Sequence, residues 1–218
     1  MILLTGFEPF GGEGSNPSWA AAVQARGLLE AEGLDVAAVE LPCVFGESIN
    51  VLNAALERHR PELVICVGQA GGRARVSLER VAINCDDARV PDNAGNQPVD
   101  QEVVAGGPAA YFSTLPIKAA LDALRMSGIP AEVSQTAGTY VCNHIFYALM
   151  HSLTISAGSA ATTVRAGFVH VPYETHQVPR GNGTPSMPAG TMAAALAVVV
   201  RTALSTGPDI TLAAGAIH

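Results

Sequence analysis

The sequence feature that most limits the possible folds is a continuous apolar run at residues 63–67, LVICV, which ends at Gly68. A strand with one wet face alternates apolar and polar residues, so an uninterrupted run is typical of a parallel strand covered on both faces. Further strands are expected at residues 2–5, 36–41, 131–135 and 166–171. The chain should therefore contain a buried, largely parallel sheet.

Helical patterns separate these strands. The first helix is expected to begin at Asn16, a preferred N-cap residue, with Pro17 in its first turn, where the missing N–H does no harm. Further helices are expected around residues 49–56, 117–124, 143–153 and 189–204. Alternating strands and helices predict an α/β fold: a single-domain layered sandwich with a largely parallel, mixed central sheet, flanked by helices on both faces.

Other segments are less regular. Residues 76–83 alternate apolar and polar side chains, which favours an edge or antiparallel strand. Residues 84–115 and 172–188 are rich in loop-forming residues and are predicted to be loops. No linker divides the chain, so we expect one domain over residues 1–218, with residues 205–218 as a loose tail.

Charge and composition exclude several classes of protein. The net charge is −7, from 12 Lys and Arg against 19 Asp and Glu, and no basic cluster offers a nucleic-acid surface. The longest apolar stretch, residues 192–200, is too short to cross a bilayer, so no membrane partner is expected. The start of the chain lacks the basic segment of a signal peptide, and the four cysteines form no CxxC pair. These features predict a cytoplasmic protein with free thiols.

Cys142 is the candidate nucleophile. It follows a strand that breaks at Gly138 and lies in the first turn of an expected helix. Unpaired N–H groups and the positive end of the helix dipole favour the thiolate, the reactive form of the side chain. The alternative is a buried cysteine that acts as a small apolar residue.

A thiol hydrolase also needs a base, and histidine is the natural one because it titrates near neutrality. Ligands of parallel sheets bind beyond the carboxyl ends of the strands. His170 lies at such an end, but its position alone leaves a structural role equally open. His144 is two residues from Cys142, a spacing at which helical side chains point apart, and His176 is a competitor in the loop.

Several motifs resemble those of the pyroglutamyl peptidase I family. The segment 134–143, SQTAGTYVCN, resembles the cysteine signature of this family, and GQAGG with SLERVAIN at 68–72 and 77–84 resembles its glutamate signature. Further similar segments are LTGFEPFGG at 4–12, NPSW at 16–19, RVPDNAGNQP at 89–98, GGPAA at 106–110 and GFVHVPY at 167–173. These blocks occur in family order over most of the chain.

The resemblance implies a cysteine exopeptidase that hydrolyses the amide bond after an N-terminal pyroglutamyl residue of peptides. Cys142 would form a thioester acyl-enzyme, His170 would act as general base and acid, and Glu79 would orient His170. A glutamate beside an arginine is usually a surface charge, with Arg75 or Arg80 as partner here, but a strand interior disfavours an unpaired charge. The resemblance further implies a homotetramer and no cofactor.

Other residues are candidates for the oxyanion site and the substrate pocket. Gln69, Arg89 and the N–H groups of Val141 and Cys142 are candidates for the oxyanion side, although Arg89 could instead pair with Asp86 or Asp87. The pocket candidates are Phe7, Phe10, Asn16, Thr139, Tyr140 and Val141. The resemblance implies that the aromatic rings cover a lactam, whereas spacing alone is equally consistent with a hydrophobic contact under the loop.

The sequence alone is also compatible with two other functions. A different cysteine amidase acting on small amides would need the same nucleophile and base. A nucleotide-binding module could use the glycine-rich turn at 68–72, but this turn lacks both the G-x-G-x-x-G spacing and a Gly-Lys-Ser/Thr end. Zinc needs four convergent ligands, and the only close pair is Cys142 with His144. We therefore expect no metal.

Overall fold

The computed structural model describes residues 1–158, 164–179 and 181–215. Its centre is a six-stranded sheet with the order β2-β1-β3-β8-β4-β7. These strands are β1 (Ile2–Phe7), β2 (Val36–Leu41), β3 (Leu63–Gln69), β4 (Val76–Glu79), β7 (Ala131–Ser134) and β8 (Arg165–Val171). All neighbours pair in parallel except β4 and β8, which are antiparallel. The predicted fold class is confirmed.

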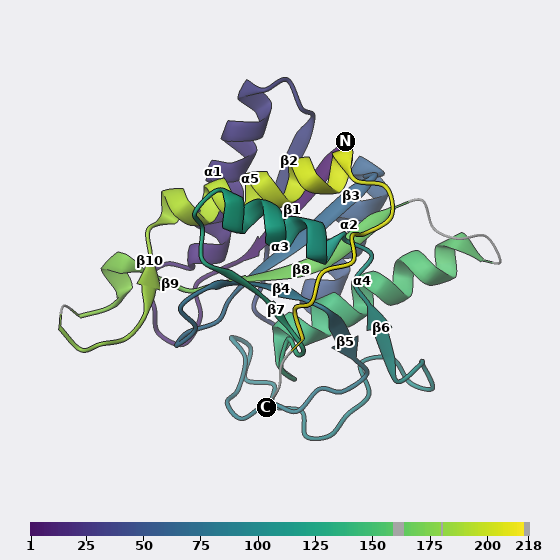
Figure 1. The fold of residues 1–218 in the computed structure, drawn as a ribbon. Coiled ribbons are helices and arrows are strands. Elements are labelled where there is room, and N and C mark those ends of the chain that lie inside the picture. The colour runs from purple at the N-terminus through teal and green to yellow at the C-terminus, as the bar shows by residue number, and fades with distance from the viewer. Residues whose placement is uncertain (159–163, 180, 216–218) are drawn as a thin grey trace.

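Helices cover both faces of this sheet (Figure 1). α1 (Pro17–Ala31), α3 (Ile117–Met126) and α5 (Ala189–Ser205) share one core cluster with one face. α2 (Glu47–His59) and α4 (Val141–Ala157) share a second cluster with the other face. The run at residues 63–67 forms most of β3 and is fully enclosed between these two layers.

The first helix begins as its residues predict. Asn16 has extended backbone angles, and its Oδ1 accepts the N–H of Ser18 at 3.1 Å, with Pro17 in the first turn. α4 begins at Val141, two residues earlier than the sequence pattern suggested, because the extended backbone of Tyr140 ends the preceding loop. Cys142 is therefore the second residue of α4.

The short strands differ from the expected pattern, which was one strand at 76–83 and loops at 84–115 and 172–188. The alternating segment at 76–83 is two strands: β4 ends at Glu79, and β5 (Val81–Ile83) pairs antiparallel with β6 (Ala110–Phe112) in a separate sheet. The segment 172–188 contains β9 (Tyr173–Glu174), the short 3₁₀ helix η1 (Thr175–Gln177) and β10 (Ser186–Met187). Strands of two or three residues carry too little periodicity to be recognised in sequence.

Part of the segment from residue 206 to 215 is held against the core, where a loose tail was expected over residues 205–218. The carboxylate of Asp209 accepts the N–H groups of Lys118 and Ala119 at 2.9 Å each, so it caps the start of α3. Lys118 also donates to the carbonyl of Leu212, and Leu212 and Ala214 pack on the core. Residues 216–218 of that expected tail lie outside the described residues.

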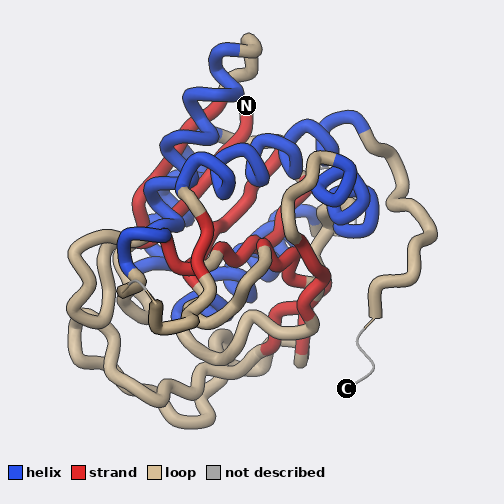
Figure 2. The backbone as a smooth tube through the Cα atoms, turned by 60° about the vertical axis from the view of Figure 1, so that its left-hand side comes forward, coloured by secondary structure: helices blue, strands red, loops and turns tan. Residues whose placement is uncertain are grey.

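The sheet places the carboxyl ends of β1, β3 and β8 at one edge. Most of the long loops gather at the end of the molecule away from the N-terminus (Figure 2). Ligands of parallel sheets bind beyond the carboxyl ends of the strands, so we look for the site at the ends of β1, β3 and β8.

Gly6 tests how closely β1 packs on α1. A Cβ at Gly6 would lie 2.5 Å from the backbone Cα of Trp19, a contact that α1 cannot relieve without moving. Gly6→Ala should therefore lower the free energy of unfolding by about 1–3 kcal/mol, measured by denaturant titration. The control is Gly27→Ala inside α1, where a Cβ meets open space; it should stabilise by about 0.5–1 kcal/mol. Equal effects of the two substitutions would contradict this packing.

Candidate active site

Cys142 lies at the carboxyl edge of the sheet, against β3. A Cβ built on Gly68 would be 2.7 Å from Cys142 Sγ, so the thiol rests directly on the backbone of Gly68. Part of Cys142 is exposed, whereas Cys66, which lies in β3 with Gly68, is fully buried. Only glycine at position 68 leaves room for the sulfur.

His170 lies in β8, the strand that pairs with β3. It is the register partner of Gly68 across the β3–β8 pair, and paired residues of adjacent strands, about 4.8 Å apart, point to the same face. The imidazole and the thiol therefore share one face of the sheet. His170 and Cys142 therefore both lie next to Gly68 on this face of the sheet.

Glu79 fixes the orientation of His170. Glu79 Oε1 lies 2.7 Å from His170 Nδ1, and both side chains are buried. An ionised carboxylate only accepts, so Nδ1 carries the proton and Nε2 is left as the basic nitrogen. Glu79, His170 and Cys142, which lie far apart in the sequence, thus form one constellation.

The partner of Glu79 among the arginines is Arg73, not Arg75 or Arg80. Arg73 Nη1 donates to the same Oε1 at 2.6 Å. Arg80 instead donates to Gln135, and Arg75 pairs with Glu132. Sequence reasoning missed Arg73 because it follows a glycine-rich turn whose path cannot be read from composition.

Asn143 anchors the start of α4, which sequence reasoning also missed. Its Oδ1 accepts the N–H of Ile83 at 3.0 Å, and its Nδ2 donates to the carbonyls of Ile83 and Cys85. Asn143 is fully buried. Because it is the residue after Cys142, these three hydrogen bonds also fix the position of the nucleophile.

The electrostatic environment corrects the expectation of a ready-made thiolate. Burial raises the pKa of the Cys142 thiol well above its ordinary value, Cys43 and Glu79 raise it further, and Arg73 lowers it. The helix terminus alone therefore does not ionise the thiol. A base must remove the proton, and the basic nitrogen of His170 faces the same side of the sheet.

His144 has a structural position. Its Nδ1 lies 2.7 Å from Asp86 Oδ2, and its Nε2 accepts the N–H of Gly46 at 2.9 Å. Both ring nitrogens are thus engaged in holding two loops against α4. His176 is exposed and contacts Ser15 and Glu174. Both histidines therefore have partners of their own, outside the pair formed by His170 and Glu79.

A cavity of about 240 Å³ opens beside Cys142. It is lined by Phe7, Phe10, Ser15, Asn16, Cys43, Gln69, Gly71, Tyr140, Val141, Cys142 and Tyr173. The structure thus brings together Phe7, Phe10, Asn16, Gln69, Tyr140 and Val141 as the sequence predicted. The rings of Phe10 and Tyr140 lie 5.2 Å apart, and Phe7 also belongs to the core, so the phenylalanines both line the cavity and make hydrophobic contacts.

Some predicted pocket residues have other contacts. Thr139 does not line the cavity; its hydroxyl donates to the carbonyl of Asp87, and its own carbonyl accepts the N–H of Asp87. Arg89 is exposed and outside the cavity lining. Asn16 reaches the cavity, although its amide caps α1 and donates to Glu8.

Cys43, Gly71 and Tyr173 are pocket residues that were not predicted. Tyr173 packs so closely on Gly71 that a Cβ there would lie 2.3 Å from the ring. Gly71, the first glycine of the Gly71-Gly72 pair, was the available signal, since a glycine can mark a close approach of another group. Tyr173 thus closes one side of the cavity.

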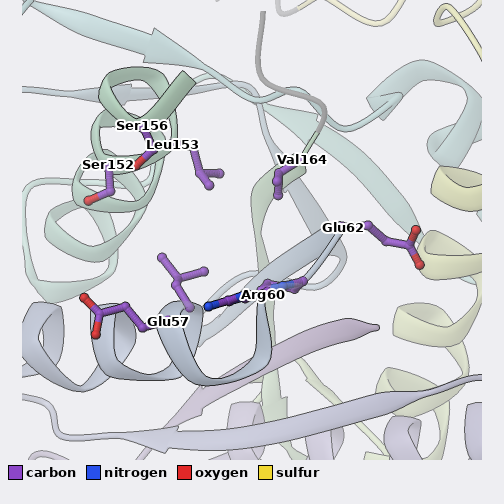
Figure 3. Close-up of a pocket in the computed structure, with 9 residues that line it drawn as sticks. Glu57, Arg60, Glu62, Ser152, Leu153, Ser156 and Val164 are labelled. Atoms are coloured by element: carbon purple, nitrogen blue, oxygen red, sulfur yellow. The ribbon is translucent and has the colours of Figure 1, made fainter. Parts of the chain in front are cut away.

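A larger cavity of about 470 Å³ lies at the opposite ends of β3 and β8 (Figure 3). It is lined by Leu56, Glu57, Arg60, Pro61, Glu62, Ser152, Leu153, Ser156 and Val164. None of these side chains is a cysteine or a histidine, and the cavity is remote from Cys142. Size therefore does not identify the catalytic cavity.

The described residues also bear on a metal site and on a membrane span. Among them, no group of three or more His, Cys, Asp and Glu side chains could hold a metal ion. No helix in the described part of the chain is long and apolar enough to cross a membrane.

A partly buried thiol, a histidine on the same face of a parallel sheet and a carboxylate behind that histidine define the class of α/β cysteine hydrolases. Comparisons with known proteins narrow this class. The family model described as pyroglutamyl peptidase matches residues 1–206. The chain belongs to the pyroglutamyl peptidase family.

Relatives match over nearly their whole length. The chain is similar to the pyrrolidone-carboxylate peptidases of Klebsiella pneumoniae and Escherichia fergusonii, at 56% and 54% identity, covering 100% of this chain and 99% of each relative. Among solved structures, pyroglutamyl peptidase I of Bacillus amyloliquefaciens has a TM-score of 0.88 at 44% identity, with 97% of this chain and 98% of that chain covered. The pyrrolidone carboxyl peptidase of Thermococcus litoralis has a TM-score of 0.87 at 35% identity, with the same coverage.

Replacing Cys142 tests whether its role differs from that of the buried cysteines. Cys142→Ala should abolish hydrolysis, because no other thiol faces both the cavity and His170. Cys66→Ala is the matched control: it should keep activity and lose on the order of 1 kcal/mol of stability from its packing. Turnover and thermal unfolding of both variants measure this. Substantial activity in Cys142→Ala would show that another group is the nucleophile.

The two buried histidines should differ in their effect on thiol chemistry. His170→Ala should abolish turnover and move the alkylation of Cys142 by iodoacetamide to higher pH, because the raised pKa of the thiol then lacks a base to offset it. His144→Ala should keep the pH profile and lose stability, because Asp86 and Gly46 lose their partner. Alkylation rates against pH decide between them. A profile that moves only in His144→Ala would reverse the assignment.

Proposed function

We propose that this chain is a cysteine exopeptidase that removes an N-terminal pyroglutamyl residue from peptides. The observation that carries the proposal is the small cavity beside Cys142, in a chain that belongs to the pyroglutamyl peptidase family. A pyroglutamyl residue is a flat, uncharged five-membered lactam. A cavity of about 240 Å³ suits such a ring better than a long side chain.

The geometry supports an acyl-enzyme mechanism. His170 Nε2 takes the proton of Cys142 as Sγ attacks the pyroglutamyl carbonyl carbon and forms a tetrahedral oxyanion. The intermediate collapses to a thioester as the C–N bond breaks, and the leaving amine takes the proton from His170. Water, deprotonated by His170, then hydrolyses the thioester and frees pyroglutamate. Glu79 stabilises the imidazolium that forms in each half of the cycle.

The oxyanion is assigned to the start of α4 and to Gln69. The first N–H groups of a helix have no acceptor within the helix, so those of Val141 and Cys142 can donate to a developing charge. Gln69 lines the cavity, and its Oε1 accepts from Gln177 at 3.2 Å, which turns its amide NH₂ away from Gln177. Arg89, exposed outside the cavity, is the weaker candidate.

The lactam ring is assigned to the aromatic part of the cavity. Phe10 and Tyr140 would cover its faces, and Phe7 would form the floor. The backbone around Tyr140 and Val141 lies beside the nucleophile, where it can pair with the lactam N–H and C=O. Thr139 is not included, because its carbonyl already accepts the N–H of Asp87.

Three further properties belong to this proposal. Peptides with an N-terminal pyroglutamate are the expected partners, the protein acts in the cytoplasm, and it assembles as a homotetramer. The resemblance to the family supports the tetramer, and Phe112 and Val99, 67% and 65% exposed, are apolar residues suited to burial between subunits. Light scattering coupled to size-exclusion chromatography tests the assembly.

Substrate discrimination tests the pocket. In a site that hydrogen-bonds both lactam groups, a proline ring leaves the partner of the missing carbonyl unpaired, which can reduce kcat/KM by about 10⁴-fold. Open-chain N-terminal glutamate should also be a very poor substrate, because its charges would have to lose their water. The measurement is kcat/KM for pyroglutamyl, prolyl and glutamyl amides of one reporter amine. Prolyl turnover within about tenfold of pyroglutamyl turnover would mean that only ring shape is recognised.

A further inference from the structure

Glu79 is a fully buried carboxylate whose two hydrogen-bond partners meet at one oxygen. Oε1 accepts from His170 Nδ1 at 2.7 Å and from Arg73 Nη1 at 2.6 Å. Oε2 is also buried and has no hydrogen-bond partner among the described residues. The orientation of the carboxylate is therefore set by a cation on one side and by the imidazole on the other.

Arg73 differs from His170 because its charge is permanent. A buried carboxylate without a partner is costly, since it has lost its water. When His170 is neutral, before the thiol is deprotonated, Arg73 is the cation that remains beside Glu79. The contact with Arg73 therefore gives the Glu79 carboxylate a charged partner that does not depend on His170.

A glycine-rich turn delivers Arg73 to this position. The N–H of Arg73 donates to the carbonyl of Ala70 at 3.3 Å, and Gly72 between them has φ +87°, which favours glycine. Gly71 in the same turn lines the substrate cavity. The glycine-rich turn at 68–72, which was considered above for nucleotide binding, therefore connects the cavity wall to Arg73, the partner of the Glu79 carboxylate.

Arg73 also reaches the loop before the nucleophile. Its Nη2 donates to the carbonyl of Thr136 at 3.2 Å, and its Nη1 lies 3.4 Å from Ser134 Oγ. This loop runs from the end of β7 to Cys142 at the start of α4. The guanidinium of Arg73 thus contacts both Glu79 and the loop that leads to Cys142. A guanidinium suits these contacts because it is planar and its N–H donors point in several directions.

We propose that Arg73 is a positioning residue for catalysis: it holds the Glu79 carboxylate against His170 and adds positive charge to the Cys142 site. The proposal rests on the catalytic roles proposed above for Cys142, His170 and Glu79. Arg73 does not touch the substrate, so its effect passes through Glu79 and through the charge that the thiol experiences. Burial, Cys43, Glu79 and Cys66 raise the pKa of the Cys142 thiol, and Arg73 is the cation that lowers it.

The test compares three variants of the full chain. Arg73→Gln removes the charge, Arg73→Lys keeps the charge but not the fork, and Arg75→Gln removes a nearby arginine that pairs with Glu132 on the surface. Two measurements test catalysis: the steady-state kinetics (kcat and KM) with a pyroglutamyl-amide reporter, and the rate of iodoacetamide labelling of Cys142 against pH, followed by mass spectrometry of the peptide that contains Cys142. Thermal unfolding of each variant measures its stability.

Arg73→Gln should lower kcat by about 10- to 100-fold, the loss expected for a hydrogen bond to a charged group, with a much smaller change in KM. Its labelling profile should move to higher pH, because the cation that lowers the pKa of the thiol is gone. Arg73→Lys should keep the wild-type profile and recover part of kcat. Arg75→Gln should match the wild type in both measurements.

Two results would overturn the proposal. One is wild-type kcat and labelling in Arg73→Gln. The other is a loss of kcat with lower thermal stability but an unchanged labelling profile, which would make Arg73 purely structural. A wild-type protein that labels at Cys142 but releases nothing from the reporter would instead refute the proposed function, while the labelling profiles would still test Arg73.

Discussion

The site depends on one buried carboxylate. Glu79 is fully enclosed, and its Oε1 accepts from both His170 and Arg73. Removing one partner of a buried ion pair typically costs about 3–5 kcal/mol, so this arrangement constrains every segment that contributes to it. β4 supplies Glu79, β8 supplies His170, and the turn after β3 supplies Arg73. The strand order brings these three segments together.

The reversed direction of β4 explains why Glu79 is buried. β4 is antiparallel to β8, with Ser77 opposite His170 and Leu78 opposite Val169. Glu79 follows further along β4 and therefore lies deeper in the sheet than His170, on the same face as Ser77. If β4 ran parallel to β8, the residues after Ser77 would instead approach the carboxyl ends of β3 and β8, where the sheet is exposed. The reversal keeps the orienting carboxylate away from water while His170 and Cys142 remain at the edge.

The sequence predicted the elements with strong patterns and the residues with motif resemblance. The buried strand at 63–67, the cap at Asn16 and the cluster of Phe7, Phe10 and Cys142 lie where they were expected. Long-range contacts of polar side chains could not be predicted, because no local pattern encodes them. Arg73 with Glu79, Asn143 with Ile83 and Asp209 with Lys118 all depend on how distant segments meet. The raised pKa of Cys142 likewise follows from burial, which the helix-terminus argument did not include.

The cavity contains two thiols, and this bears on the selectivity of covalent inhibitors. Cys43 and Cys142 both line it. Burial raises the pKa of Cys43 to about 12, with Glu8 and Asp92 adding to the effect, so Cys43 stays protonated and unreactive. Burial also raises the pKa of Cys142, but Cys142 has a histidine on its own face of the sheet and is the more exposed of the two thiols. An electrophile carried on a lactam ring would therefore meet two sulfur atoms and react with Cys142, which both the neighbouring imidazole and its exposure favour.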